Sequence, residues 1–389
     1  MTHSLFMNSL VFIHTPIRRG VSMFNHLGKA CSLSAIPLRS CFWISLLFLL
    51  TACERPTAVQ SGYRGTAMLQ IYKPAALAAT ASLHEVPEPE PVDPPEPDGP
   101  KLKDLYENIQ VLNDLSPLEF SRLMAAMATW VAPNEGCKFC HNTKNLASDE
   151  KYTKVVARRM LQMTRNLNNQ WKSHIKDTGV TCWTCHRGQA VPSGDWFNNT
   201  GLPHSEGTML GEKAGQNTPG MSVVGNTSLP FNPLSTFLMD GDHNIRIQGT
   251  QALAGQNRRS IKQAEHTYGL MVYMSTSLGV NCTYCHNTRA MGDWSISTPQ
   301  RVTAWYGIRM VRDINSHYLT ELAPWFPSYR LSEEGDFPKV GCATCHKGAY
   351  KPLYGVSMLP DYPELAKEIT YEKSSVPVKP PAAAEAERH

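Results

Sequence analysis

Eight cysteines of this 389-residue chain occur in four pairs, each with two residues between the cysteines and a histidine directly after the second. This C-x-x-C-H pattern is typical of covalent haem attachment, in which both thiols bond to the porphyrin and the imidazole reaches the iron from one face. The pattern therefore predicts four haem c groups. The paired thiols are Cys137 and Cys140, Cys182 and Cys185, Cys282 and Cys285, and Cys342 and Cys345, and the iron ligands are His141, His186, His286 and His346.

A single unit of this kind could instead be a redox-active dithiol or half of a zinc site. Four copies, each with its own histidine, favour haem, because a zinc site of four cysteines needs no histidine after every second one. The remaining cysteines, Cys31, Cys41 and Cys53, lie in or directly after an N-terminal leader, so the rest of the chain has no unused thiol. Covalent haem attachment also fits an exported protein.

The ligand on the second face of each iron decides what the haem can do. An open face permits catalysis or gas binding, whereas a filled face largely restricts the iron to electron transfer. Methionines on helices predicted before three of the units could fill that face, although methionines also commonly fill gaps in protein cores. Each has a second methionine one turn later on the same face, so helical spacing cannot choose within a pair. The pairs are Met124 and Met127, Met160 and Met163, and Met271 and Met274.

The fourth haem has two candidate ligands. The internal repeat of the sequence places Met310 at the position of Met160, whereas His174 lies eight residues before Cys182. A histidine near a helix end is more often a surface residue, so the residue pattern leaves both candidates open. Six other histidines are expected at the surface or at caps: His84, His204, His243, His266, His317 and His389.

The four units form two similar pairs. The segment C-K-F-C-H-N-T at Cys137 matches C-T-Y-C-H-N-T at Cys282, and residues 181–192 match residues 341–352. No run of alternating strand residues appears. The sequence therefore predicts a mainly α fold with much irregular structure, built as two pseudo-twofold-related halves that carry two haems each. Capping signals and apolar periodicity predict the main helices at 116–131, 150–175, 259–278 and 297–319.

The N-terminus has the features of a signal peptide. Arg39 precedes a short apolar run, Cys41–Leu50, that is too short for a comfortable membrane span. The run ends Leu50-Thr51-Ala52-Cys53, which resembles a bacterial lipoprotein cleavage site. Cys53 is therefore predicted to become a lipid-bearing N-terminus. Cleavage without lipidation and a retained anchor helix are the alternatives.

The predicted organisation has six parts. The segment between the two halves is rich in Gly, Asn, Thr and Pro, and a hairpin is expected there near 237–247. The parts are a lipoprotein-type signal peptide (1–52), an N-terminal extension with a Pro/Glu linker (53–101), the first haem-pair half (102–195), a connector (196–255), the second haem-pair half (256–358) and a partly disordered C-terminal tail (359–389).

The formal charge of +4 comes from four basic residues in the leader, where no acidic residue occurs, so the rest of the chain is formally neutral. That balance gives no reason to expect a nucleic acid partner. Four haems would add about eight propionates, which would make the assembled protein acidic and favour a cationic partner.

Longer blocks carry a family resemblance. From Cys53 to about Leu365 the chain resembles the tetrahaem cytochrome c subunit of the purple-bacterial photosynthetic reaction centre. The connector differs in length from the family pattern, and the C-terminal tail is longer and rich in Pro and Ala. The matching blocks, more specific than C-x-x-C-H alone, are Gly62–Gly65, Glu119–Phe120, Trp130–Pro133, Val156–Met160, Gly179–Cys182, Ser277–Gly279, Ala304–Asp313 and Asp361–Leu365.

The resemblance implies a ligand for every haem. Met124, Met160 and Met271 would be the sixth ligands of haems 1, 2 and 3, and His174 from the other half would be that of haem 4. It also implies that the haems lie in the spatial order 1, 2, 4, 3, with haem 3 nearest the pigment pair. With every iron held on both faces, the protein would transfer electrons and would not be an enzyme.

The resemblance further implies partners and a location. Such a subunit lies on the periplasmic face of the bacterial inner photosynthetic membrane, anchored by its N-terminal lipid and bound to reaction-centre core subunits of the L, M and H type. It re-reduces the photo-oxidised bacteriochlorophyll pair and is itself reduced by a soluble donor, either a small cytochrome c or a high-potential iron–sulfur protein. The alternatives are a multihaem shuttle, soluble or membrane-attached, and a multihaem reductase.

Overall fold

The computed structural model describes residues 55–368 except 63, 66–67, 92–98, 101, 199–228, 231, 240, 242 and 248–258. The predicted signal peptide, Cys53, most of the predicted connector and the chain after residue 368 lie outside the described residues. Contacts divide the chain into the units Met1–Glu54 and Arg55–His389. The fold described below is that of the second unit.

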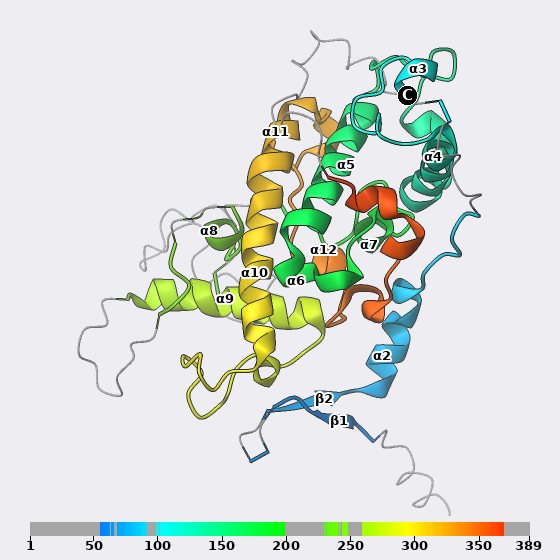
Figure 1. Cartoon of the computed structure of the whole chain (residues 1–389). Helices are drawn as coiled ribbons and strands as arrows, with labels where there is room; N and C mark the ends of the chain where they lie inside the picture. The colour runs from blue at the N-terminus through cyan, green and yellow to red at the C-terminus, as the bar shows by residue number, and fades with distance from the viewer. Residues whose placement is uncertain are drawn as a thin grey trace, which may run out of the picture. The chain divides into compact units, whose positions relative to one another are not determined.

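Four long helices form the frame of this unit (Figure 1). They all lie within the predicted helical ranges: α4 (Pro117–Val131), α5 (Tyr152–Gln170), α9 (Ile261–Leu278) and α10 (Pro299–Ile314). The backbone leaves the α region at Trp171, and the short helix α6 (Lys172–Ile175) follows α5. α10 continues through one π-helical turn, η5 (Asn315–Leu319), into α11 (Thr320–Leu322).

Two of the helix starts follow from reciprocal capping pairs. The Ser116 hydroxyl accepts a hydrogen bond from the backbone N–H of Glu119, whose carboxylate accepts one from the backbone N–H of Ser116. Ser260 and Gln263 form the same pair at the start of α9. Each pair satisfies two N–H groups that have no partner inside the helix, and its loss costs about 1 kcal/mol. The signal at Ser116 is local, which is why the sequence predicts that start.

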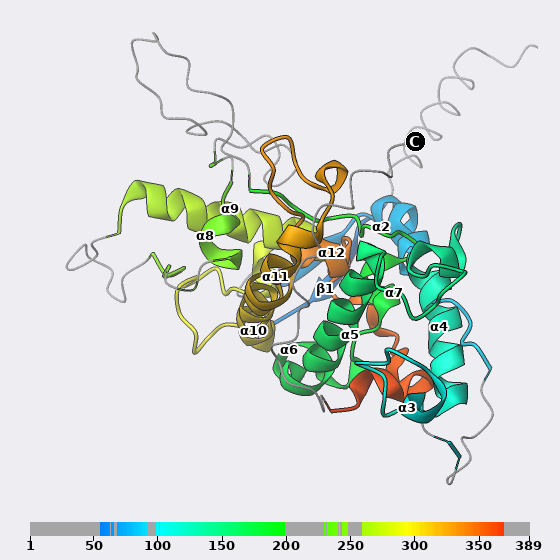
Figure 2. The same cartoon turned by 90° about the horizontal axis from the view of Figure 1, so that it is seen from above.

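The C-x-x-C-H units take two different forms. The second and fourth units are the short helices α7 (Cys182–His186) and α12 (Cys342–His346), which contact each other and lie side by side in Figures 1 and 2. Each helix ends at a residue in the left-handed conformation, Arg187 or Lys347, both with a φ of 49°. The first and third units form single 3-10 turns, η2 (Gly136–Phe139) and η4 (Cys282–Tyr284).

A small antiparallel sheet begins the unit. Strand β1 (Thr57–Gln60) pairs with β2 (Leu69–Tyr72). The sequence did not predict this sheet, because four residues are close to the shortest run in which alternation can be read. At the start of the hairpin predicted near 237–247 the chain forms a helix, α8 (Ser235–Leu238), instead.

The remaining elements are short. They are α2 (Pro74–Thr80), η1 (Ala81–His84), α3 (Leu102–Leu105), η3 (Lys176–Thr178), η6 (Ala323–Trp325), η7 (Ser328–Arg330), η8 (Pro352–Gly355), η9 (Leu359–Asp361) and η10 (Pro363–Ala366). Among the described residues, none of these elements and none of the longer helices is long and apolar enough to span a bilayer.

Buried apolar side chains form three clusters that hold the helices together. One joins α4 and α5 to the segment after α12, through residues such as Leu123, Leu161 and Leu365. A second joins α8, α9 and α10, and a third joins α5, α10 and α11. Because Leu365 is fully buried, ordered packing extends into the predicted C-terminal tail.

Candidate haem-binding site

Six of the described imidazoles have Nδ1 within hydrogen-bond distance of a backbone carbonyl. One is His266, whose partner is the carbonyl of Lys262 one helical turn earlier. The other five are the four unit histidines and His174. A carbonyl only accepts, so Nδ1 must carry the proton, and this leaves the Nε2 lone pair free to bind a metal. The carbonyl partners are Leu146 for His141, Gln189 for His186, Met291 for His286, Ala349 for His346 and Thr303 for His174, at distances of 2.8 to 3.1 Å.

The charge state of these rings also suits coordination. Burial lowers the pKa of His346 to about 4, and the nearby His174 adds to that effect. Burial likewise lowers the pKa of His174, His186 and His286. These imidazoles are therefore neutral at pH 7, which is the form that binds metal.

Four of the eight unit thiols have a raised pKa, unlike the attacking thiol of a redox-active dithiol. Burial raises the pKa of Cys140 and Cys285 to about 11 and that of Cys182 and Cys342 to about 12. Exchange-active C-x-x-C thiols need a lowered pKa, because the thiolate is the nucleophile. The environment of these four cysteines therefore favours a structural use of the sulfur, such as a thioether.

Two cysteines of different units lie next to each other. The Cα atoms of Cys185 and Cys345 are 4.5 Å apart. The short Cα separation places the second and fourth attachment sites next to each other.

Equivalent hydrogen bonds relate the two halves of the sequence repeat. The Asn168 side chain bonds both the N–H and the carbonyl of Val180, two residues before the second unit. The Asn315 side chain makes the same two bonds to Val340, two residues before the fourth unit. All four distances are 2.8 to 2.9 Å. Each asparagine therefore fixes the position of its helix relative to the following unit.

Arginines one turn earlier extend the equivalence. Arg165 donates from Nε to the carbonyl of Glu364, and Arg312 donates from Nε to that of Phe237. Asn168 donates to the carbonyl of Leu365, the residue after Glu364. Asn315 donates to the carbonyl of Leu238, the residue after Phe237. The two helices α5 and α10 therefore have a common register, defined by an Arg-x-x-Asn sequence in each.

That register corrects one sequence prediction. Met310 lies five residues before Asn315, and the residue five before Asn168 is Met163, so Met310 corresponds to Met163 and not to Met160. Met310 is also buried among Leu167 and other apolar residues of the third cluster. Its packing is that of a core residue, so the repeat gives no reason to make it a ligand of the fourth haem.

The structure does not distinguish the two methionines of each pair as candidate ligands. In each pair both members are half-buried and face an apolar cluster, Met124 and Met127 from α4 among them. The packing therefore does not choose between the first and second methionine of a pair. Met124, Met160 and Met271 stay predictions as axial ligands.

His174 and His346 come together across the two halves of the chain. Their ring centroids are 6.2 Å apart, and the ring planes make an angle of 67°. Two imidazoles on opposite sides of one metal, each at a bond length of about 2 Å, have centroids roughly 6 Å apart. The spacing therefore fits one iron held between the two Nε2 atoms.

One histidine differs from the surface position expected for it. His84 is buried, with its ring centroid 4.3 Å from that of Tyr354. Its Nδ1 lies 3.4 Å from a guanidinium nitrogen of Arg187, directly after the second unit. The sequence around His84 does not predict its burial, because its contact with Arg187 joins residues about a hundred positions apart.

Comparison with known proteins assigns the chain to a family. A family model described as the photosynthetic reaction centre cytochrome C subunit matches residues 53–366. Photosynthetic reaction center cytochrome c subunits from Rubrivivax gelatinosus and Thermochromatium tepidum are 51% and 48% identical over 321 residues, which is 82% of this chain and 86% and 78% of theirs. The corresponding subunit of Roseobacter denitrificans is 42% identical over 324 residues, 79% of this chain and 85% of its own. This chain therefore belongs to the family of photosynthetic reaction centre cytochrome c subunits.

Proposed function

We propose that this subunit carries four c-type haems and re-reduces the photo-oxidised bacteriochlorophyll pair of the reaction centre. Family membership makes it a haem c protein that transfers electrons to the reaction centre. Covalent haem supplies an iron that accepts and releases one electron at a time. The observation that carries the finer proposal is the approach of His174 to His346, whose ring centroids are 6.2 Å apart and whose Nδ1 atoms are both held by backbone carbonyls.

The polypeptide would act by holding both faces of each iron. His346 and His174 would bind one iron from opposite sides, and the other three unit histidines would each be opposed by a methionine, Met124, Met160 or Met271. An iron with both faces filled cannot bind a substrate, which separates this function from that of a multihaem reductase. A thioether is a weaker donor than imidazole and raises the reduction potential, so the site with two histidines should be the one with the lowest potential.

Contacts between the ligand-bearing helices support the haem order 1, 2, 4, 3. α4, with the methionine proposed for haem 1, contacts α7, which is the unit of haem 2. α7 contacts α12, the unit of haem 4, and α12 contacts α9, with the methionine proposed for haem 3. Neighbouring sites are therefore joined by directly packed helices, which keeps each electron transfer step short.

The N-terminal sheet supports a membrane-proximal position for haem 3. The backbone carbonyl of Leu69 in β2 accepts hydrogen bonds from the side chains of Asn281 and Thr283 in and beside the third unit. Cys53 precedes β1 by only four residues in the sequence. Lipid on Cys53 would therefore tether the third site to the periplasmic membrane surface. A single lipid gives weak anchoring, so contact with the L, M and H type core subunits would share the task.

The haems also bear on the soluble donor. A small cytochrome c or a high-potential iron–sulfur protein would serve as that donor, and the propionates of four haems would favour one with a cationic docking surface.

Four measurements test the proposal. The intact mass of the mature chain should include four covalently bound haems and a lipid. Flash excitation of membranes should oxidise these haems within the lifetime of the oxidised pigment pair. Haems that stay reduced after the flash would contradict the electron-donor role. Stoichiometric carbon monoxide binding by the native reduced protein would favour a reductase, and a lipid-free chain that elutes apart from membranes would favour a shuttle.

A further inference from the structure

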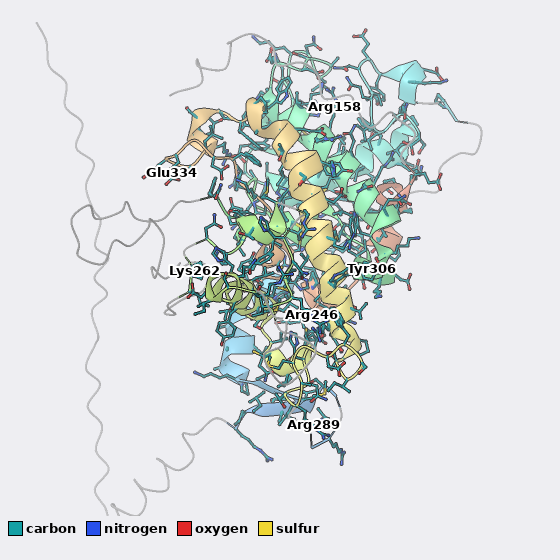
Figure 3. All side chains as sticks on the ribbon, turned by 90° about the vertical axis from the view of Figure 1, so that its left-hand side faces the viewer. Arg158, Arg246, Lys262, Arg289, Tyr306 and Glu334 are labelled. Carbon is teal, nitrogen blue, oxygen red and sulfur yellow. A yellow bond between two sulfur atoms is a disulfide. The ribbon has the colours of Figure 1, made fainter. Side chains whose placement is uncertain are left out.

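A glycine on α10 occupies the position that corresponds to Met160, the proposed ligand of haem 2. Counting back eight residues from the equivalent asparagines gives Met160 on α5 and Gly307 on α10. Both helices are regular between these positions and the asparagine. The position that supplies the proposed sulfur ligand of haem 2 is therefore occupied in the second half by a residue with no side chain. Tyr306, labelled in Figure 3, marks this stretch of α10.

The space left by the missing side chain is filled by His174. A methyl group built on Gly307 would lie 2.6 Å from Cε1 and 2.8 Å from Nδ1 of that imidazole. Such distances are well inside van der Waals contact, so no side chain fits at residue 307 while the ring stays in place. The ring also donates from Nδ1 to the carbonyl of Thr303, one helical turn earlier, at 2.9 Å. His174 therefore lies directly against the backbone of α10.

Glycine is otherwise unfavourable at this position. Residue 307 lies inside a 16-residue helix, where glycine weakens the helix relative to alanine. Its φ is not in the left-handed region, so the backbone conformation does not require glycine. A residue that breaks a local preference without a local reason points to a functional constraint. Here that constraint is the close approach of the His174 ring.

We infer that Gly307 selects the axial ligand of the fourth haem. Its missing side chain has two effects: it removes a methionine from the position equivalent to Met160, and it opens the space through which His174 reaches the iron opposite His346. This inference rests on the proposed function, because it assumes that these two histidines bind haem 4. Gly307 acts through His174 and is a positioning residue.

The first test is Gly307→Ala in the complete reaction-centre complex. To restore ordinary van der Waals contact with a methyl group the ring must move about 1 Å. Metal-ligand distances tolerate only about 0.2 Å, so His174 should leave the iron. The expected results are carbon monoxide binding at one of the four ferrous haems and a shift of the lowest of the four midpoint potentials. Val302→Ala, an uncharged change at an exposed position on the same helix, is the control and should leave both unchanged.

The second test examines whether residues 160 and 307 occupy equivalent positions in the two halves. In the double variant Gly307→Met with His174→Gly, a thioether should occupy the position that Met160 has in the first half. One additional methionine-to-iron charge-transfer band should appear in the oxidised spectrum, and the lowest potential should rise. His174→Gly alone should instead leave an iron that binds carbon monoxide. This comparison remains informative if the alanine variant assembles poorly.

The outcomes separate this inference from the proposed function. If the wild-type complex has no haem with two histidine ligands, the proposed ligand set is wrong. If the wild type has that haem but Gly307→Ala keeps its potential and its resistance to carbon monoxide, only the role of Gly307 is refuted. A double variant without a new methionine band would refute the equivalence of residues 160 and 307.

Discussion

The imidazoles of His174 and His346 lie with their ring centroids 6.2 Å apart, although the two residues are 172 positions apart in the chain. Each ring is oriented by its own backbone carbonyl, that of Thr303 or that of Ala349. The pair joins the first half of the repeat to the second. Under the proposed function, this pair would hold the iron of haem 4.

Replacing His174 with methionine should raise the potential of one haem. A thioether ligand stabilises the reduced iron more than a second imidazole does. The lowest of the four midpoint potentials should therefore rise, while the other three stay nearly unchanged. A redox titration that resolves four haems in purified membranes is the measurement. A wild-type titration with no low-potential haem would instead show that His174 is not a ligand.

The methionine pairs can be separated by matched substitutions. We expect Met160→Leu to open one iron to carbon monoxide, because leucine has a similar volume but no donor atom. Met163→Leu, one turn along the same face of α5, should leave all four irons closed. The same comparison applies to Met124 with Met127 and to Met271 with Met274. If substitution of the second methionine of a pair allows carbon monoxide to bind, that second methionine is the ligand of the haem.

The two asparagines of the repeat should be important for stability. Asn168→Ala and Asn315→Ala each leave a valine N–H and carbonyl without their partner, and each such loss costs about 1 to 3 kcal/mol. Thermal melting followed by haem absorption should show a lower midpoint for both variants. Asn169→Ala, on the same helix as Asn168 but outside the contact with Val180, should have a smaller effect. Unchanged melting of either variant would refute the proposed role of these side chains.

The ion pair of Asp149 predicts a pH dependence in the acid range. Burial raises the pKa of Asp149, but hydrogen bonds from Arg158 and Asn108 outweigh it and lower the value from 3.8 to about 2. A lowered folded-state pKa gives stability that is present above the unfolded value and is lost as pH falls from about 4 to about 2.

Asp149→Asn checks this dependence. The variant should be less stable than the wild type near neutral pH, and the difference should disappear as the pH approaches 2. The carboxylate is partly exposed, so the difference should be modest. Urea unfolding at a series of pH values measures it. A difference that stays constant down to pH 2 would show that the carboxylate charge contributes nothing.

The sequence alone determined the parts of this protein that depend on local order along the chain. The attachment units, the helix start at Ser116 and the family blocks are all recognised from residues a few positions apart. The structure confirms the cap at Ser116, and the comparisons confirm the family. The repeat was also visible, but its register was misread, because the short similarity around Met160 and Met310 outweighed the more distant asparagines.

Tertiary structure decided the rest, because the deciding contacts join residues far apart in the sequence. Hydrogen bonds to Val180 and Val340 set the register of the repeat, and only the fold brings His174 against Gly307 and opposite His346. The burial of His84 and the adjacency of Cys185 and Cys345 arise in the same way. Sequence spacing can place a residue on one face of a helix. Which side chains pack against that face depends on contacts with elements that lie far away along the chain.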